Sequence, residues 1–287
     1  NVVQVVGVAI LLNLVLGLVV SAILHYGAPL LLTLMGLRPE LMVYGVGYME
    51  IVGAFAFFQA LSLTVSASLR SANKAVYPMM VIVVVNILNI IGNYSLIFGK
   101  FGMPALGVEG AAISTAFARG VSMIILFIIL FRKYIPKFPI DYFRPFPFVE
   151  LKNLLKIGLP SAGENMSYSL SQVLLTYFIN MLGNEALTTR TYVVNMVMFV
   201  YLFAIAMAQG GAICIGHLVG EKKIRAAYLL GKYVMRISIL VSLVLSCIWA
   251  LMGHTLFSWL TDNAEIVRLG TVILFVDVIL EVGRAIN

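Results

Sequence analysis

Long apolar segments repeat along the whole chain, with short polar breaks between them. A helix that crosses a bilayer needs about 20 mostly apolar residues. The segments do not alternate apolar and polar positions as membrane strands do. The pattern therefore predicts an all-α polytopic membrane protein with eight transmembrane helices. These helices are expected at residues 5–33, 41–69, 77–98, 106–131, 151–182, 189–217, 228–259 and 266–287.

Composition supports the membrane assignment. The 287-residue chain is 62% hydrophobic and 11% charged, whereas a soluble domain is about 45–50% apolar and about 25% charged. A soluble enzyme and a nucleic-acid-binding module are therefore poor interpretations. His25, His217 and His254 are dispersed, and Cys214 and Cys247 lie in apolar segments without ligand spacing. We expect no catalytic centre, no metal site and no disulfide.

The net charge of +7 is explained by loop position rather than by an anionic partner. Thirteen basic residues lie in or beside three alternate breaks, and only four lie in the other breaks. Short cytoplasmic loops collect lysine and arginine in this way. The first helix is therefore predicted to run outward from the cytoplasm of a plasma-membrane protein. The thirteen are Arg70, Lys74, Arg132, Lys133, Lys137, Arg144, Lys152, Lys156, Lys222, Lys223, Arg225, Lys232 and Arg236, and the four are Arg38, Lys100, Arg190 and Arg268.

A proline-rich break divides the chain into two predicted lobes. One lobe with a cytoplasmic linker covers residues 1–149, and an incomplete second lobe covers residues 150–287. Shifting the chain by 225 residues aligns the first two helices with the last two, which indicates a six-helix parallel repeat. The parent is then expected to have twelve spans in two six-helix lobes, with about two helices missing at each end of this chain, and we expect it to be a monomer. The prolines of the break are Pro136, Pro139, Pro145 and Pro147.

Charged groups inside the bilayer are costly and call for a reason. Asp277, Glu281 and Arg284 share one face of the last helix. Arg284 can pair with Glu281 at i+3, so these two side chains either only fix packing or take part in transport. Asp277 and Glu164 have no obvious partner in their own helices. A desolvated carboxylate of this kind can take up H⁺ or hold Na⁺ during a transport cycle.

Uncharged polar residues also form stripes. Tyr168 and Gln172 share a face with Glu164, and such a face must point to a neighbouring helix or to a watery cavity. Asn86, Asn89 and Asn93 share a face of the third segment, where we expect contacts between helices. The residues predicted to line a substrate cavity are Asn165, Tyr168, Gln172, Gln59 and Arg284, and the predicted cation-coupling residues are Glu164, Asp277 and Glu281.

Residues 78–120 closely resemble the fifth and sixth helices of the multidrug and toxic compound extrusion (MATE) family, most specifically in Asn93-Tyr94 and in Gly-Val-Glu-Gly-Ala-Ala at 107–112. Residues 157–165 and 280–287 resemble its seventh and tenth helices. The resemblance implies a secondary transporter with two six-helix lobes and a central cavity. Members exchange Na⁺ or H⁺ for cationic or amphipathic drugs, and some use acids of the seventh and tenth helices. The acid that some relatives place deeper in the seventh helix has no counterpart in residues 167–172.

The sequence thus predicts an antiporter that exports small organic, cationic or amphipathic compounds in exchange for Na⁺ or H⁺, without another cofactor. A lipid-linked oligosaccharide flippase of related architecture is the alternative. That alternative requires more cationic residues in the cavity to hold a pyrophosphate. Here the intramembrane set holds four acids and two arginines, which favours cationic cargo. The set is Glu50, Arg119, Glu164, Asp277, Glu281 and Arg284.

Overall fold

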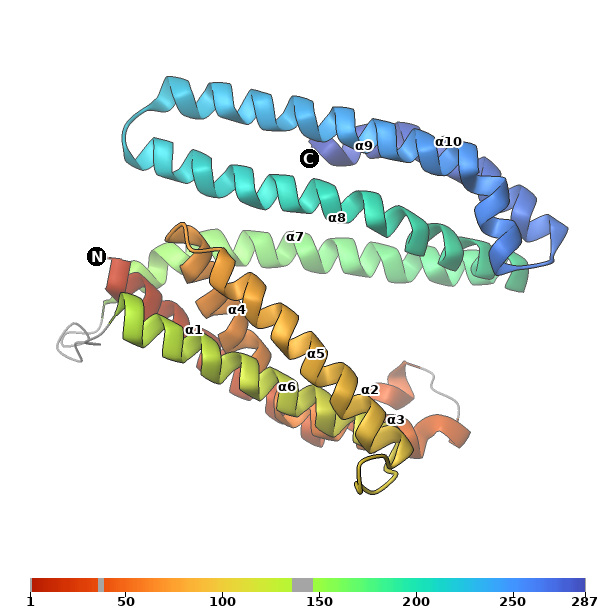
Figure 1. Cartoon of the computed structure of the whole chain (residues 1–287), viewed down its shortest axis with the longest axis horizontal. Helices are drawn as coiled ribbons and strands as arrows, with labels where there is room; N and C mark the ends of the chain where they lie inside the picture. The colour runs from red at the N-terminus through yellow and green to blue at the C-terminus, as the bar shows by residue number, and fades with distance from the viewer. Residues whose placement is uncertain (1, 36–38, 136–146, 287) are drawn as a thin grey trace. The chain divides into compact units, whose positions relative to one another are not determined.

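The computed structural model describes residues 2–35, 39–135 and 147–286, and this part of the chain is helical throughout apart from short turns (Figure 1). The prolines Pro136, Pro139 and Pro145 of the predicted break lie outside the described residues, as do the basic residues Arg38, Lys137 and Arg144. The chain forms two compact units, residues 1–160 and residues 161–287. Their boundary lies inside α7, after the position at which the prolines place the end of the first lobe.

Unit 1 contains the first seven elements and the start of α7, and unit 2 contains the rest. The elements of unit 1 are α1 (Val2–Tyr26), α2 (Ala28–Leu34), α3 (Pro39–Ala54), α4 (Ala56–Ser71), α5 (Val76–Phe98), α6 (Gly107–Ile129) and the π-helical turn η1 (Leu130–Tyr134). The later helices are α7 (Phe148–Asn180), α8 (Asn184–Gly220), α9 (Ile224–Leu260) and α10 (Ala264–Ile286).

Six of the eight predicted spans are long and apolar enough to be recognised as membrane-crossing helices from these two properties alone. Five helical segments of the described chain, which include α1, α5, α6 with η1, α8 and α9, are long and apolar enough to cross a membrane, and the bent pair α3–α4 makes a sixth. The remaining two helices, α7 and α10, do not meet these criteria. In α10 the reason is its charge, because Asp277, Glu281 and Arg284 follow one another along it. Both of these helices carry the polar side chains from which the candidate site is built.

The first predicted span, 5–33, is interrupted at Gly27, between α1 and α2. Pro29 stands in the first turn of α2 and has no amide hydrogen, so it cannot continue the hydrogen-bond ladder across the junction. Gly27 lies against the backbone of the preceding turn, where its amide donates to Ile23 O over 2.8 Å. The apolar run alone did not reveal this break.

The second predicted span, 41–69, bends by 45° at Phe55, between α3 and α4. Side chains of α1 satisfy backbone groups on both sides of the bend. Ser21 Oγ accepts a hydrogen bond from Phe57 N over 3.0 Å. His25 Nδ1 lies 3.0 Å from Glu50 O, so this ring nitrogen donates the hydrogen. Apolar surroundings make an unpaired backbone group costly, so these two contacts stabilise the bend.

Ser21→Ala is expected to lower the free energy of unfolding by about 1–2 kcal/mol, because the partly buried amide of Phe57 then loses the acceptor that Ser21 provides. Thermal unfolding of the purified protein in detergent measures the change. Ser68→Ala is the matched control, since Ser68 Oγ donates only to Thr64 O of its own helix, over 2.9 Å. Equal stability of the two variants would contradict the role of Ser21 at the bend.

The asparagine stripe of α5 contacts α6, as the sequence predicted. Asn89 Nδ2 donates to Thr115 Oγ1 over 3.4 Å, and Asn93 Nδ2 donates to Asn89 Oδ1 over 3.1 Å. In the opposite direction, Ser114 Oγ donates to Asn89 O over 3.2 Å. The prediction of polar contacts between helices is therefore confirmed for Asn89, whereas the hydrogen bond of Asn93 stays within α5.

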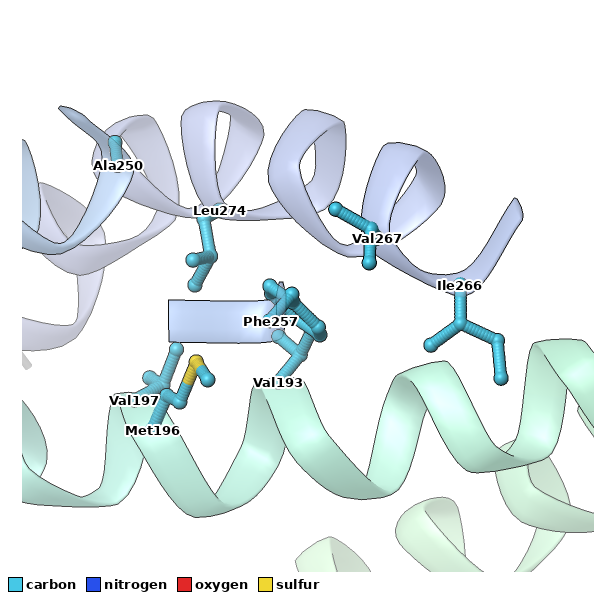
Figure 2. Packing of buried hydrophobic residues seen from close by; sticks show 8 residues of the cluster. All are labelled: Val193, Met196, Val197, Ala250, Phe257, Ile266, Val267 and Leu274. Carbon is cyan, nitrogen blue, oxygen red and sulfur yellow. The ribbon is translucent and has the colours of Figure 1, made fainter. Parts of the chain in front are cut away.

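The core of unit 2 is an apolar cluster at one end of α8, α9 and α10. Figure 2 shows the Phe257 ring between the side chains of α8 and those of α10. Phe257 is fully buried. A Cβ added to Gly270 would overlap the Phe257 ring, so α9 and α10 can approach this closely only because residue 270 is glycine. The cluster is Val193, Met196, Val197, Ala250, Phe257, Ile266, Val267 and Leu274.

Candidate functional site

A cavity of about 680 Å³ lies within unit 2, and four helices contribute to its wall. Helix α7 supplies Glu164, Asn165 and Tyr168, and α10 supplies Arg284. The remainder of the wall is mostly apolar and comes from α8, α9 and the end of α10, where Ala285 and Ile286 lie. A cavity with apolar walls and a few convergent polar groups is the usual form of a small-molecule site. The α8 and α9 residues are Tyr201, Ala204, Ile205, Ala208, Gly211, Ala212, Ile215, Gly231, Val234, Met235 and Ser238.

Small side chains on α8 make room for the cavity. Ala204, Ala208, Gly211 and Ala212 follow at helical spacing and therefore lie on one face. A Cβ on Gly211 would come within 2.9 Å of Val234 on α9, so glycine also permits a close approach of the two helices. The sequence reasoning missed this stripe and Tyr201. The i, i+4, i+7, i+8 spacing of small residues was the signal that could have revealed it.

The polar stripe of α7 reaches the cavity through three of the predicted residues. Glu164, Asn165 and Tyr168 all have exposed side chains, and α7 has no buried residue. Asn165 Nδ2 donates to Ser161 O, 2.8 Å away in the preceding turn. Within the described residues, no hydrogen bond or ion pair is formed by the Glu164 carboxylate, which can therefore accept a ligand.

Three charged residues of α10, Asp277, Glu281 and Arg284, form one connected group, which we call the α10 group. Arg284 pairs with Glu281, and its Nη1 also lies 3.5 Å from Asp277 Oδ1. Glu281 is fully buried, and its Oε2 has no hydrogen-bond partner among the described residues. The prediction that Asp277 lacks a partner in its own helix is wrong, because the long arginine side chain reaches back two turns. When all three side chains are ionised, the group carries one excess negative charge.

Arg284 connects this group to the cavity. Its side chain lines the cavity, whereas Asp277 and Glu281 do not. The guanidinium is 35% exposed, while the Asp277 side chain is 11% exposed and that of Glu281 is 0% exposed. Arg284 is thus the member of this group that both contacts the two acids and lines the cavity.

Two predicted cavity residues lie elsewhere. Gln172 does not line the cavity, because Arg190 of α8 donates to its Oε1 over 2.9 Å and also to Thr176. The sequence analysis did not expect Arg190 to bind the α7 stripe. Gln59 has an exposed side chain on α4, in unit 1, and is not part of the unit 2 cavity. The structure thus brings Glu164, Asn165, Tyr168 and Arg284 together and leaves these two outside.

The described helices form a polytopic helical membrane protein with a partly polar cavity. The MatE family model matches residues 1–95 and 160–287, and the chain belongs to this family. The family resemblance and the all-α polytopic fold are therefore confirmed. Several relatives are named as multidrug resistance or multidrug export proteins, and the bacterial relatives place this chain in the plasma membrane as a multi-pass protein.

Curated relatives cover almost the whole chain. The "Uncharacterized transporter YisQ" of Bacillus subtilis is 37% identical over 275 residues, which are 96% of this chain and 60% of that protein. The "Multidrug resistance protein NorM" of Photobacterium profundum is 25% identical over 286 residues, which are 96% of this chain and 61% of that protein. The chain thus spans about three fifths of the length of these relatives, which is consistent with eight helices of a twelve-helix architecture.

Solved structures show the same fold. An outward-facing multidrug resistance MATE family transporter of the MOP superfamily superposes with a TM-score of 0.82 at 22% identity, covering 99% of this chain and 65% of that chain. A crystal structure of MATE in the bent conformation superposes with a TM-score of 0.80 at 20% identity, covering 99% of this chain and 70% of that chain.

Proposed function

We propose that the protein containing this chain is a monomeric, cation-coupled antiporter that exports small organic cations or amphipathic compounds in exchange for Na⁺ or H⁺. The observation that carries the proposal is the α10 group, in which two carboxylates share a single arginine that also lines the cavity. An excess negative charge in a low-dielectric setting attracts a proton or a monovalent cation.

The cavity itself suits organic cations. Glu164 offers an unpaired carboxylate, and Tyr168 and Tyr201 offer aromatic faces to the same space. Aromatic rings attract cations that lie over them, and the apolar walls accept the remainder of an amphipathic molecule. The charged lining consists of one acid and one arginine, which does not favour the pyrophosphate of a lipid-linked oligosaccharide.

Exchange follows because Asp277 and Glu281 neutralise Arg284, and the extent of this neutralisation determines how strongly Arg284 repels a cationic cargo. When Asp277 or Glu281 binds a coupling cation, the arginine is less neutralised, and its positive charge repels a cationic cargo from the cavity. When the coupling ion leaves, the acids hold Arg284 again and cationic cargo is tolerated. Binding of the two ligands is thus negatively linked, and the linkage is reciprocal. One charge crossing 100 mV supplies about 2.3 kcal/mol for export.

Dye efflux tests the proposal. Proteoliposomes loaded with ethidium are energised with a Na⁺ gradient and, separately, with a pH gradient. We expect export with one of these gradients and a loss of about tenfold or more in both Glu164→Gln and Asp277→Asn, because the first removes the carboxylate offered to a cationic cargo and the second removes an acid that binds the coupling cation.

A control for acid-to-amide replacement is Glu221→Gln. Glu221 lies outside the cavity in the α8–α9 turn, where its carboxylate is 2.7 Å from Lys223 Nζ. The hydrogen bond from Lys223 lowers the pKa of Glu221, and exposed pairs of this kind contribute little to stability. Efflux that persists in Glu164→Gln and Asp277→Asn at the level of this control would show that these acids do not couple transport. No efflux under either gradient would refute the antiporter proposal.

A further inference from the structure

A second cavity of about 560 Å³ lies in unit 2, between the end of α9 and the start of α10. It shares no residue with the cavity described above. Three different ionisable side chains line it, namely His254 of α9, Asp262 of the connecting turn and Arg268 of α10. The wall also contains the polar side chain of Ser258 and the apolar side chains of Val267 and Val272.

The turn that forms one end of this cavity is held in place from several sides. Asn263 Oδ1 accepts the amide of Glu265 over 2.9 Å and so caps α10. Its Nδ2 donates to Glu185 Oε1 of α8 over 3.0 Å. Thr261 Oγ1 accepts the amide of Asn263 over 3.2 Å. Asp262 therefore occupies a fixed position between two anchored neighbours.

The ionisable side chains of the cavity are not used to build the fold. Within the described residues, no hydrogen bond or ion pair is formed by the His254 ring, the Asp262 carboxylate or the Arg268 guanidinium. Arg268 lies in the field of Glu265, which is on the same helix and outside the cavity wall. Charges of both signs thus line one cavity without pairing with each other, which leaves both to recognise a ligand.

The predicted topology places the cavity near the phospholipid headgroups. The α9–α10 turn is at the opposite end of α9 from the basic Lys222–Lys223 turn, which the distribution of basic residues assigns to the cytoplasm. Trp259, beside the cavity residue Ser258, is 75% exposed, and tryptophan is enriched at membrane–water interfaces. With the predicted orientation, the cavity opens at the level of the outer leaflet.

We propose that this cavity binds the headgroup of an outer-leaflet phospholipid that carries both a phosphate and a primary ammonium, that is, phosphatidylethanolamine. The phosphate contacts Arg268 and His254, and the ammonium donates hydrogen bonds to Asp262. Val267 and Val272 lie against the glycerol and the start of the acyl chains. Phosphatidylglycerol offers no cation to Asp262, and the quaternary ammonium of phosphatidylcholine has no hydrogen to donate.

Native mass spectrometry of the purified protein with the three lipids at equal concentration tests the proposal. We expect the unmodified protein to retain phosphatidylethanolamine about tenfold better than phosphatidylglycerol or phosphatidylcholine, as a charge-assisted hydrogen bond allows. Asp262→Asn should abolish this preference, and Arg268→Gln should weaken retention of all three lipids. Arg225→Gln, on the exposed start of α9 at the other end, should change neither.

Two outcomes would overturn the proposal. One is retention of phosphatidylethanolamine by Asp262→Asn and Arg268→Gln at the level of the Arg225→Gln control. The other is displacement of the lipid by free phosphoethanolamine at equal concentration, which would identify a water-soluble ligand instead. Both variants change exposed side chains, and a thermal unfolding curve confirms that they fold. The lipid preference is independent of dye efflux, so it can fail while the antiporter proposal stands.

Discussion

Arg284→Met is expected to lower the free energy of unfolding by about 3 kcal/mol, because it leaves a fully buried carboxylate without its cation. Glu281 is 0% exposed, and only one of its two oxygens has a partner. The value is at the low end of the range for a broken buried pair, since Arg284 itself is 35% exposed. Thermal or denaturant unfolding of the purified protein in detergent measures the loss.

The paired variant Arg284→Met with Glu281→Gln should recover most of that stability, because the uncompensated charge is gone. A strong interaction of this kind makes the two changes non-additive. Arg225→Met serves as the control for loss of an arginine, since Arg225 is exposed and forms no hydrogen bond or ion pair in the described chain. If Arg284→Met unfolds at the same temperature as Arg225→Met, the α10 group does not stabilise this unit.

Phe257→Ala is expected to cost about 3 kcal/mol of stability, because it opens a cavity at the centre of the unit 2 core (Figure 2). The value is at the low end for loss of a buried phenyl ring, because lipid chains also solvate the ring when the helices separate. The loss comes from the packing contacts made by the ring. Phe275→Ala on α10 is the matched control, as that ring is 52% exposed, and its stability should change by less than about 0.5 kcal/mol.

Gly270 provides a second test of the same contact. Gly270→Ala alone should destabilise the protein, because its methyl group overlaps the Phe257 ring. In the Phe257→Ala background the same methyl group enters empty space, so it should stabilise. Gly283→Ala on the same helix meets nothing within 4 Å and should be neutral or slightly stabilising in both backgrounds. The same sign for Gly270→Ala in both backgrounds would show that the α9–α10 contact differs from the one described.

Hydropathy predicted the helices well and their interruptions poorly. The apolar content of a run reports that it is a membrane helix, and Gly27 and Pro29 interrupt a run without making it polar. The bend at Phe55 has no local signal, because its stabilising groups, Ser21 and His25, come from another helix. Such a break depends on tertiary contacts that a single run does not encode.

The candidate site was also predicted only in part, because periodicity identifies which residues share a face but not which neighbours they contact. Helical periodicity correctly grouped Asp277, Glu281 and Arg284 on one face. It did not predict that one arginine reaches both acids, because that depends on the rotamer of a long side chain. Gln172 shares the stripe of Glu164, yet Arg190 of α8 binds it. Which neighbour a polar residue meets is set by the packing of helices and not by its own periodicity.

The side chains at the Phe55 bend also have a mechanical consequence. Straightening α3 and α4 into one rod would pull Phe57 and Glu50 away from Ser21 and His25, and hydrocarbon offers no replacement partners. Motion that keeps these links must carry α1 along with the bent span. Spectroscopic labels on α1 and α4 should therefore keep a constant separation through the proposed transport cycle, because the two helices move as one rigid body.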